Sequence, residues 1–244
     1  MPQSPDYPVP ALEKGLDILE ALAVAAVPQS LADLAARLQR SRSELFRMLN
    51  CLERRGYVTR DSLSAKYGLS LKLYALAHGH SVTEKLLQAA RMPMRTFTEG
   101  SRESCHLSVL DREQLLVVAQ EESPERVRLS IEVGAVFEPA RTASGRLLLA
   151  YRKPAERGTA DGETPPELEK TLAAIRRSGI STAESETING VRDVAVLVGD
   201  PAGGLIAALA VTRLLRRGER GDDAALVTGM RAAAREITEA LGLA

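Results

Sequence analysis

The segment 41–56, SRSELFRMLNCLERRG, limits the possible folds more than any other stretch of this sequence. If it is helical, apolar side chains three and four residues apart form one face, namely Leu45, Met48, Leu49 and Leu52. A separate stripe is polar and consists of Ser43, Arg47, Asn50 and Arg54. Arg and Asn can hydrogen-bond to base edges, and Arg and Ser can contact phosphates. The pattern therefore indicates either a DNA-reading helix or a solvated surface helix.

Two further helices are predicted upstream of this segment. Residues 11–24 carry leucines at helical spacing. Ser30 is a suitable N-cap for a helix over 31–39, and Asp33 occupies the capping-box position. The connection to the third helix, through Arg40, is short. Helix, helix, short turn and helix is the order of a helix-turn-helix unit.

The residues after Gly56 predict a β-hairpin. Strands are expected at 57–59 and 66–69, on either side of a polar turn. A short hairpin behind a recognition helix is a wing, and Arg60 and Lys66 near its tip would then reach the DNA backbone or the minor groove. The same hairpin can also be a cover over the helical core, and the two interpretations are compatible.

The distribution of charge separates this region from the rest of the chain. The formal net charge of the protein is +0, but residues 37–72 contain nine Lys or Arg and three Asp or Glu. Their local net charge is therefore +6, and the remainder carries −6. This asymmetry fits a module that contacts phosphates joined to one that does not, although a basic patch can also be ordinary surface.

Cysteine content and the distribution of apolar residues indicate the cellular compartment. The two cysteines, Cys51 and Cys105, fall in different expected domains, so reduced thiols are the simpler assumption. Residues 1–10 contain four prolines and are expected to form a disordered lead without the pattern of a signal peptide. No apolar run approaches the roughly 18–20 residues of a membrane span. These features predict a cytoplasmic protein that does not enter a membrane.

Residues 30–76 resemble the N-terminal winged helix-turn-helix of the IclR family of bacterial transcription regulators. The matching residues are 43–49, Leu52, Gly56-Tyr57 and Tyr67-Gly68-Leu69. Arg47 falls on the family's characteristic arginine, whereas Glu44 stands where Thr is common. Glu44 could accept a hydrogen bond from a cytosine amine, but it would also repel phosphates. From the polar stripe, the hairpin and this resemblance together we expect DNA to be contacted by Ser41, Arg42, Ser43, Glu44, Arg47, Asn50, Arg54, Arg60 and Lys66.

A connecting region follows the hairpin. Helices are predicted over 69–77 and over 82–98, the second interrupted at Pro93. His78 and His80 have the spacing of metal ligands, but no third ligand is near, so surface histidines are the simpler interpretation. We predict no metal site and no cofactor.

The hydrophobic period then changes from helical to alternating. Strands are expected at 104–110, 115–120, 127–133, 180–185, 191–198 and 205–214. Helices are expected after Thr142, over 168–177, and over 222–241 with Asp222 as the cap. Backbone N–H groups at the start of the first of these helices suit an anion such as a carboxylate, but ordinary capping by Thr142 or Ser144 is the alternative.

This second half is similar to the GAF-like effector-binding domain of the same family, through motifs at 134–150, 175–179, 190–191 and 200–211. The resemblance implies a small-molecule pocket over the sheet. Cys105 and His106 lie on the first strand, and at most one of them can face that pocket because neighbouring strand residues alternate. The implied ligand-binding residues are Cys105, Thr142, Ser144, Gly145, Asp193, Ala210 and Thr212.

Asp193 stands where many family members have Cys. A carboxylate there favours a ligand with hydroxyls or a positive charge, and disfavours a simple acid unless Arg141 or Arg146 offsets it. A surface-facing position for Asp193 is the alternative. Family effectors include organic, sugar and aromatic acids, but aromatic residues make up only 3% of this chain. We therefore expect a small polar metabolite, with an organic or sugar acid among the candidates.

Together these features predict an α+β protein with a winged helix-turn-helix over 11–77, linker helices over 78–98 and a GAF-like α/β effector-binding domain over 99–244. We expect a dimer or tetramer that binds a near-palindromic operator in double-stranded DNA under metabolite control. One alternative is a module that binds a protein partner in place of DNA. Another is an enzyme, but Cys105 and His106 would point in opposite directions, and no Walker, dinucleotide or Gly-x-Ser-x-Gly motif is present.

Overall fold

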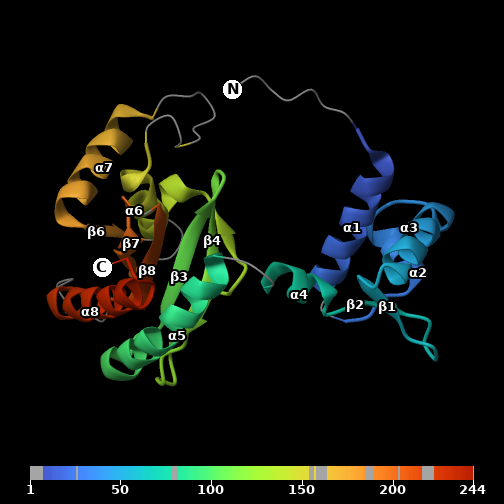
Figure 1. The fold of residues 1–244 in the computed structure, drawn as a ribbon, viewed down its shortest axis with the longest axis horizontal. Coiled ribbons are helices and arrows are strands. Elements are labelled where there is room, and N and C mark those ends of the chain that lie inside the picture. Colours follow the sequence, from blue (N-terminus) through green and yellow to red (C-terminus); the bar gives the residue numbers. More distant parts are fainter. Residues whose placement is uncertain are drawn as a thin grey trace. The chain divides into compact units, whose positions relative to one another are not determined.

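The computed structural model describes residues 8–25, 27–78, 82–153, 157, 164–184, 189–202, 204–215 and 223–243. The chain divides into two compact units, residues 1–81 and residues 82–244. Figure 1 labels most of the helices and strands of each unit. Within the described ranges, no helix is both long enough and apolar enough to cross a membrane.

The first unit is a helix-turn-helix followed by a hairpin. It contains α1 (Pro10–Ala25), α2 (Leu31–Arg37), α3 (Arg42–Arg54) and, after the hairpin, α4 (Lys72–His78). Its core contains Ile18, Leu22, Leu34, Leu45, Leu49, Val58 and Tyr67. The Asp33 N–H donates to Ser30 Oγ and the Ser30 N–H donates to the Asp33 carboxylate. This reciprocal pair confirms the predicted capping box of α2.

The hairpin consists of β1 (Val58–Arg60) and β2 (Tyr67–Leu69), which pair antiparallel. Gln29 extends the pairing, since its N–H donates to the Tyr67 carbonyl at 2.8 Å and the Tyr67 N–H donates back at 2.7 Å. Val58 and Tyr67 are buried against the helices. The hairpin therefore covers the helical core, as one of the two interpretations of the sequence requires.

The second unit is built on a six-stranded antiparallel sheet in the order β5-β4-β3-β8-β7-β6. The strands are β3 (Cys105–Asp111), β4 (Gln114–Glu121), β5 (Val136–Phe137), β6 (Ile180–Glu184), β7 (Val191–Asp200) and β8 (Leu205–Leu214). The two predicted hairpins, β3–β4 and β7–β8, are confirmed, and β3 pairs with β8 between them.

Helices cover both faces of this sheet (Figure 1). On one face, α5 (Val82–Ser101) and α8 (Ala224–Ala240) pack with Leu107, Val194 and Leu209. On the other face lie α6 (Ala143–Tyr151) and α7 (Pro166–Ser178), which pack with Ala195, Ala208 and Ala210. A 3-10 turn, η1 (Pro139–Arg141), precedes α6. Successive residues of β7 and β8 thus alternate between two separate cores.

The predicted strand at 127–133 is wrong. Within the described part of the chain this segment pairs with no strand, and Val127 and Val133 are 80% and 54% exposed. Arg128 near its start donates to the Glu122 carboxylate at 2.6 Å. Alternation of apolar and polar residues does not make a strand without a neighbour to supply hydrogen bonds, and the short β5 pairs with β4 in its place.

The helical boundaries also need correction. Pro93 does not interrupt α5, because Leu86, Ala90, Met94 and Phe97 form one stripe in the core on both sides of it. The helix expected as part of a linker over 78–98 is thus part of the core of the second unit. Pro10, placed in the expected lead, begins α1, where the missing N–H costs nothing. Residues 1–7 and the expected cap Asp222 lie outside the described residues.

Candidate functional site

The outer face of α3 is polar and accessible. Leu45 and Leu49 are fully buried, whereas Ser43, Arg47, Asn50 and Arg54 on the other side of the helix are exposed. Arg42, in the first turn, is exposed as well. Among the described residues, no hydrogen bond or ion pair engages the side chains of Arg47, Asn50 or Arg54. These side chains are therefore available to a partner outside the unit.

Glu44 has partners within the first unit. Ser41 is the N-cap of α3, and its Oγ accepts from the Glu44 N–H at 3.3 Å and donates to the Glu44 carboxylate at 2.9 Å. Lys14 Nζ donates to the same carboxylate at 2.7 Å. These bonds, led by the one from Lys14, lower the pKa of Glu44 to about 2. The Ser-x-x-Glu spacing of Ser41 and Glu44 is the sequence signal of such a capping box.

The hairpin presents two exposed cations. The Arg60 guanidinium lies over the Tyr67 ring, 5.5 Å from its centroid, and Lys66 is exposed on the other side of the turn. Asp61 Oδ1 accepts from the backbone N–H groups of Leu63, at 3.2 Å, and Ser64, at 2.6 Å. Such bonds fix the backbone of a turn. The hairpin therefore has the shape and the charge of a wing.

Strand register decides which predicted ligand residues can meet in the second unit. His106 pairs with Ala210, and Asp193 pairs with Thr212. Because Ala210 lies in the α6–α7 core, His106, Asp193 and Thr212 share that face of the sheet. Cys105, predicted as a ligand residue, instead lies in the α5–α8 core. Its thiol is 3.3 Å from Thr98 Oγ1, and burial raises its pKa to about 11.

One row of side chains crosses the sheet beneath α6 and α7. Residues directly opposite one another on successive strands are Gln120, His106, Ala210, Ala195 and Ser181, which we call the polar row. The two alanines in its centre are buried, and polar residues stand on both sides of them. Sequence reasoning missed Gln120 and Ser181 because alignment across five strands depends on register, which a strand's own sequence does not contain.

Several polar atoms on this face have unused hydrogen-bonding capacity. Ser181 Oγ, Gln120 Nε2 and Ser108 Oγ are buried without a partner among the described residues. Ser108 pairs with Ala208, so it too faces α6. Each unmade bond to a buried polar group costs about 1–3 kcal/mol. Burial lowers the pKa of His106 to about 4, so its imidazole is neutral near pH 7. These atoms keep hydrogen-bonding capacity that no described residue uses.

Asp193 is partly buried on the same face. Thr212 Oγ1 donates to Asp193 Oδ1 at 2.7 Å. Burial raises the pKa of Asp193, and the hydrogen bond from Thr212 opposes this. The cations considered from the sequence make other contacts: Arg146 Nε donates to the Ala140 carbonyl at 2.7 Å, and Arg141 pairs with Glu138 at 3.8 Å.

The side chain of the N-cap residue, Thr142, caps the start of α6. Thr142 Oγ1 accepts from the Gly145 N–H at 3.0 Å, and Ser144 is buried. A Cβ on Gly145 would lie 2.2 Å from the Pro139 carbonyl oxygen, so η1 can approach α6 only because this residue is glycine. Ordinary capping, one of the two interpretations of the sequence, is thus observed, and close packing accounts for Gly145.

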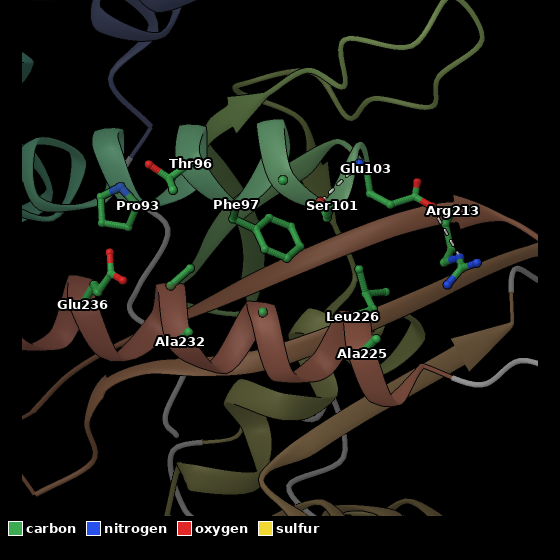
Figure 2. A pocket seen from close by; sticks show the side chains of 13 residues that line it. Pro93, Thr96, Phe97, Ser101, Glu103, Arg213, Ala225, Leu226, Ala232 and Glu236 are labelled. Atoms are coloured by element: carbon green, nitrogen blue, oxygen red, sulfur yellow. Dashed lines mark hydrogen bonds and ion pairs between the residues drawn. The ribbon is translucent and has the colours of Figure 1, made fainter.

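Two cavities of the second unit lie away from the polar row. One, of about 590 Å³, opens between α5 and α8 beside Phe97 (Figure 2). Glu236 lies at one end of it, and the ion pair between Arg213 and Glu103, at 3.7 Å, lies at the other. The second, of about 820 Å³, lies between the ends of β3 and β8, near Leu110 and Ile206. Among the described residues, no group of three or more His, Cys, Asp or Glu could hold a metal ion.

A helix-turn-helix with a wing and an α/β domain with polar groups beneath its helices define a ligand-controlled DNA-binding protein. Residues 11–62 match the family described as "IclR helix-turn-helix domain", and residues 81–239 match "Bacterial transcriptional regulator IclR C-terminal". The chain therefore belongs to the IclR family, which confirms the resemblance seen in its sequence. It is a DNA-binding transcriptional regulator with an effector-binding C-terminal domain, not an enzyme.

Individual relatives can be aligned with nearly the whole of this chain. HTH-type transcriptional regulator KdgR of Escherichia coli K12 is 28% identical over 224 residues, which cover 87% of this chain and 85% of KdgR. The glycerol operon regulatory protein of Streptomyces coelicolor is 27% identical over 248 residues, covering 96% and 97%. The crystal structure of an IclR homolog from Microbacterium hydrocarbonoxydans, complexed with 4-hydroxybenzoate, has a TM-score of 0.77 at 25% identity and covers 96% of this chain and 100% of that one.

Proposed function

We propose that α3 reads base pairs in the major groove and that the hairpin contacts the neighbouring backbone or minor groove. The exposed, unengaged stripe of Arg47, Asn50 and Arg54 on the third helix of a helix-turn-helix carries this proposal. Ser43 within the stripe, and Ser41, Arg42, Arg60 and Lys66 beside it, suit phosphate contacts. Glu44 contributes by fixing the start of α3 through its capping box, and not by accepting from a base.

A dimer or a tetramer of this chain would present such helices in pairs to a near-palindromic operator. Both the DNA target and a metabolite pool are accessible in the cytoplasm, which is the location that fits this role. Related proteins support control by a small molecule: one neighbour was crystallised with 4-hydroxybenzoate, and one relative is named for the glycerol operon.

The proposed effector site lies on the α6 side of the sheet. Asp193, Thr212 and Ala210 lie on this face, against which α6 packs, and Thr142 and Ser144 stand at the start of α6. His106 shares the face, whereas Cys105 does not. A small polar metabolite bound there would alter DNA affinity only through a difference between its affinities for two arrangements of the protein.

The experiment that tests DNA reading compares Arg47→Ala with Arg235→Ala. Arg235 is 75% exposed on α8, so its substitution removes one positive charge from the second unit. If Arg47 contacts a base or phosphate, Arg47→Ala weakens operator binding by roughly 5–150-fold, or about 1–3 kcal/mol, whereas Arg235→Ala has little effect. The operator is first selected from random duplexes, and affinity is measured by fluorescence anisotropy at several salt concentrations. Equal affinities for wild type and Arg47→Ala would refute the assignment.

A further inference from the structure

Strands β3 and β8 separate before either of them ends. Among the described residues they pair only from His106 to Ser108, although β3 continues to Asp111 and β8 begins at Leu205. A register shift in the pairing of β3 with β4 lies at the same place, between Leu107 and Ser108. Such a bulge bends its strand and can end its pairing with a neighbour. The sheet is therefore open beyond Ser108.

The cavity of about 820 Å³ occupies this opening, and its walls are mainly aliphatic. Leu86 of α5 and Leu148 of α6 are fully buried in different cores, so the cavity reaches the helices on both faces of the sheet. Half-buried apolar side chains of the strands complete the walls, namely Val109, Leu110, Leu116, Val118, Leu205 and Ile206. A mostly apolar cavity of this size is typical of small-molecule sites.

Charged residues stand at one end of the cavity, which we call the rim. Arg152 and Lys153 follow the last turn of α6, and Asp111 ends β3. Arg152 Nη1 donates to the Arg112 carbonyl at 2.8 Å, which holds the guanidinium beside the β3–β4 turn, and Lys153 is exposed. Two cations and one carboxylate give the described lining a net positive charge.

We propose that this cavity binds an aliphatic carboxylate, with its acyl chain between the strands and its carboxylate at the rim. Tyr151 is the one aromatic residue of the described lining, so burial of methylene groups contributes more there than stacking on a ring. The positive rim favours a carboxylate over a neutral or cationic head group.

The unpaired part of β3 indicates the length of the chain. Residues 109–111 extend roughly 10 Å along the strand, which an extended chain of about eight to ten carbons matches. The site is additional to the proposed effector site, because Thr142 and Tyr151 lie roughly 14 Å apart along the axis of α6. The proposal therefore goes beyond the proposed function and does not depend on it.

The location can be tested by fluorescence, because the chain contains no tryptophan. Tyr151→Trp places a single indole in the lining of the cavity. Tyr74→Trp, at a 63% exposed residue of α4 in the first unit, is the matched control. Titration of the full chain with decanoate should change the emission of Tyr151→Trp to saturation and leave that of Tyr74→Trp unchanged.

Calorimetry on the wild-type chain separates the acyl chain from the head group. Affinity should fall about tenfold for every two methylenes removed, from decanoate to octanoate to hexanoate. Octanol should bind more weakly than octanoate. Lys153→Gln should weaken octanoate binding by roughly two- to fivefold and leave octanol binding unchanged. Lys170→Gln, which removes a 73% exposed cation from α7, should bind both like wild type.

Three results would overturn the proposal. Binding of decanoate to wild type with unchanged emission from Tyr151→Trp would place the ligand elsewhere. Equal affinities for octanoate and octanol, in wild type and in Lys153→Gln alike, would exclude recognition of the acid. Absence of binding, or affinity independent of chain length, would exclude the apolar site. If Tyr151→Trp fails to fold, the chain-length series and Lys153→Gln decide the question, and none of these measurements involves operator DNA.

Discussion

Replacing Gly145 with alanine should destabilise the second unit through a backbone clash. The added Cβ would lie 2.2 Å from the Pro139 carbonyl oxygen, 2.4 Å from its Cα and 2.6 Å from its carbonyl carbon. Ordinary contact begins at 3.4 Å, so the turn η1 would have to retreat by 1.2 Å from α6. No flexible side chain can absorb this movement, because all three contacts are with backbone.

The size of the effect follows from what holds the turn. Pro139 is buried, the Arg141 N–H donates to the Glu138 carbonyl at 3.1 Å, and Arg146 Nε donates to the Ala140 carbonyl at 2.7 Å. Overpacking of a well-packed site costs about 1–3 kcal/mol and sometimes more. Alanine recovers roughly 1 kcal/mol of helix propensity, so a backbone clash at the upper end of this range gives a net loss of about 2 kcal/mol.

Thermal unfolding of the full chain measures the loss directly. For a unit of this size, about 2 kcal/mol corresponds to a fall of roughly 4–8 °C in the transition of the second unit. Gly100→Ala is the matched control, because Gly100 lies in α5 and its added Cβ would have no neighbour within 4 Å. That variant should be unchanged or slightly stabilised. Equal transition temperatures for Gly145→Ala and wild type would refute the packing account of this glycine.

Three more substitutions test other parts of the structure. Burial lowers the pKa of His106 to about 4 from the 6.5 of the unfolded chain. Because only the unfolded state binds the proton between these two values, the free energy of unfolding should fall by roughly 3 kcal/mol as the pH falls from 6.5 towards 4. Urea unfolding across this range should show a flatter pH dependence for His106→Gln. Asp223→Ala should lower the free energy of unfolding by about 3 kcal/mol, because it leaves the mostly buried Arg192 and Arg213 without their shared carboxylate. Calorimetry that shows no loss would refute a stabilising role for these ion pairs. Ser41→Ala should cost about 1 kcal/mol in the first unit, seen by circular dichroism, through loss of the α3 cap.

The helices of the first unit could be predicted from the sequence because their signals are local. Leu45 and Leu49 recur on one face and are both fully buried, and Ser30 and Asp33 cap α2 as their spacing requires. The stripe containing Arg47 is exposed for the same reason, since an amphipathic helix that buries one face must expose the other. Recognition of the family added the order of the elements and the identity of the domains.

The side of the sheet to which each strand side chain points could not be predicted in the same way. Alternation shows that Cys105 and His106 point in opposite directions, but the choice of core for each depends on helices far away in the sequence. A register shift between Leu107 and Ser108 further alters the pairing of β3 with β4. The strand predicted at 127–133 was wrong for a related reason, because the sequence of a segment does not show whether a partner strand lies beside it.

In the β7–β8 ladder, neighbouring residue pairs face opposite sides of the sheet, one towards the proposed ligand site and the other towards α8. The register pair Asp193 and Thr212 faces α6, and the adjacent pair Arg192 and Arg213 faces the start of α8, where both arginines meet Asp223. Because side chains alternate, a substitution in the first pair should change the proposed ligand site without removing the ion pairs, and a substitution in the second should do the reverse. Ligand selectivity and unfolding free energy should therefore respond to different pairs of this ladder. A variant of Asp193 that altered stability as strongly as Asp223→Ala would show that the two faces are not separable.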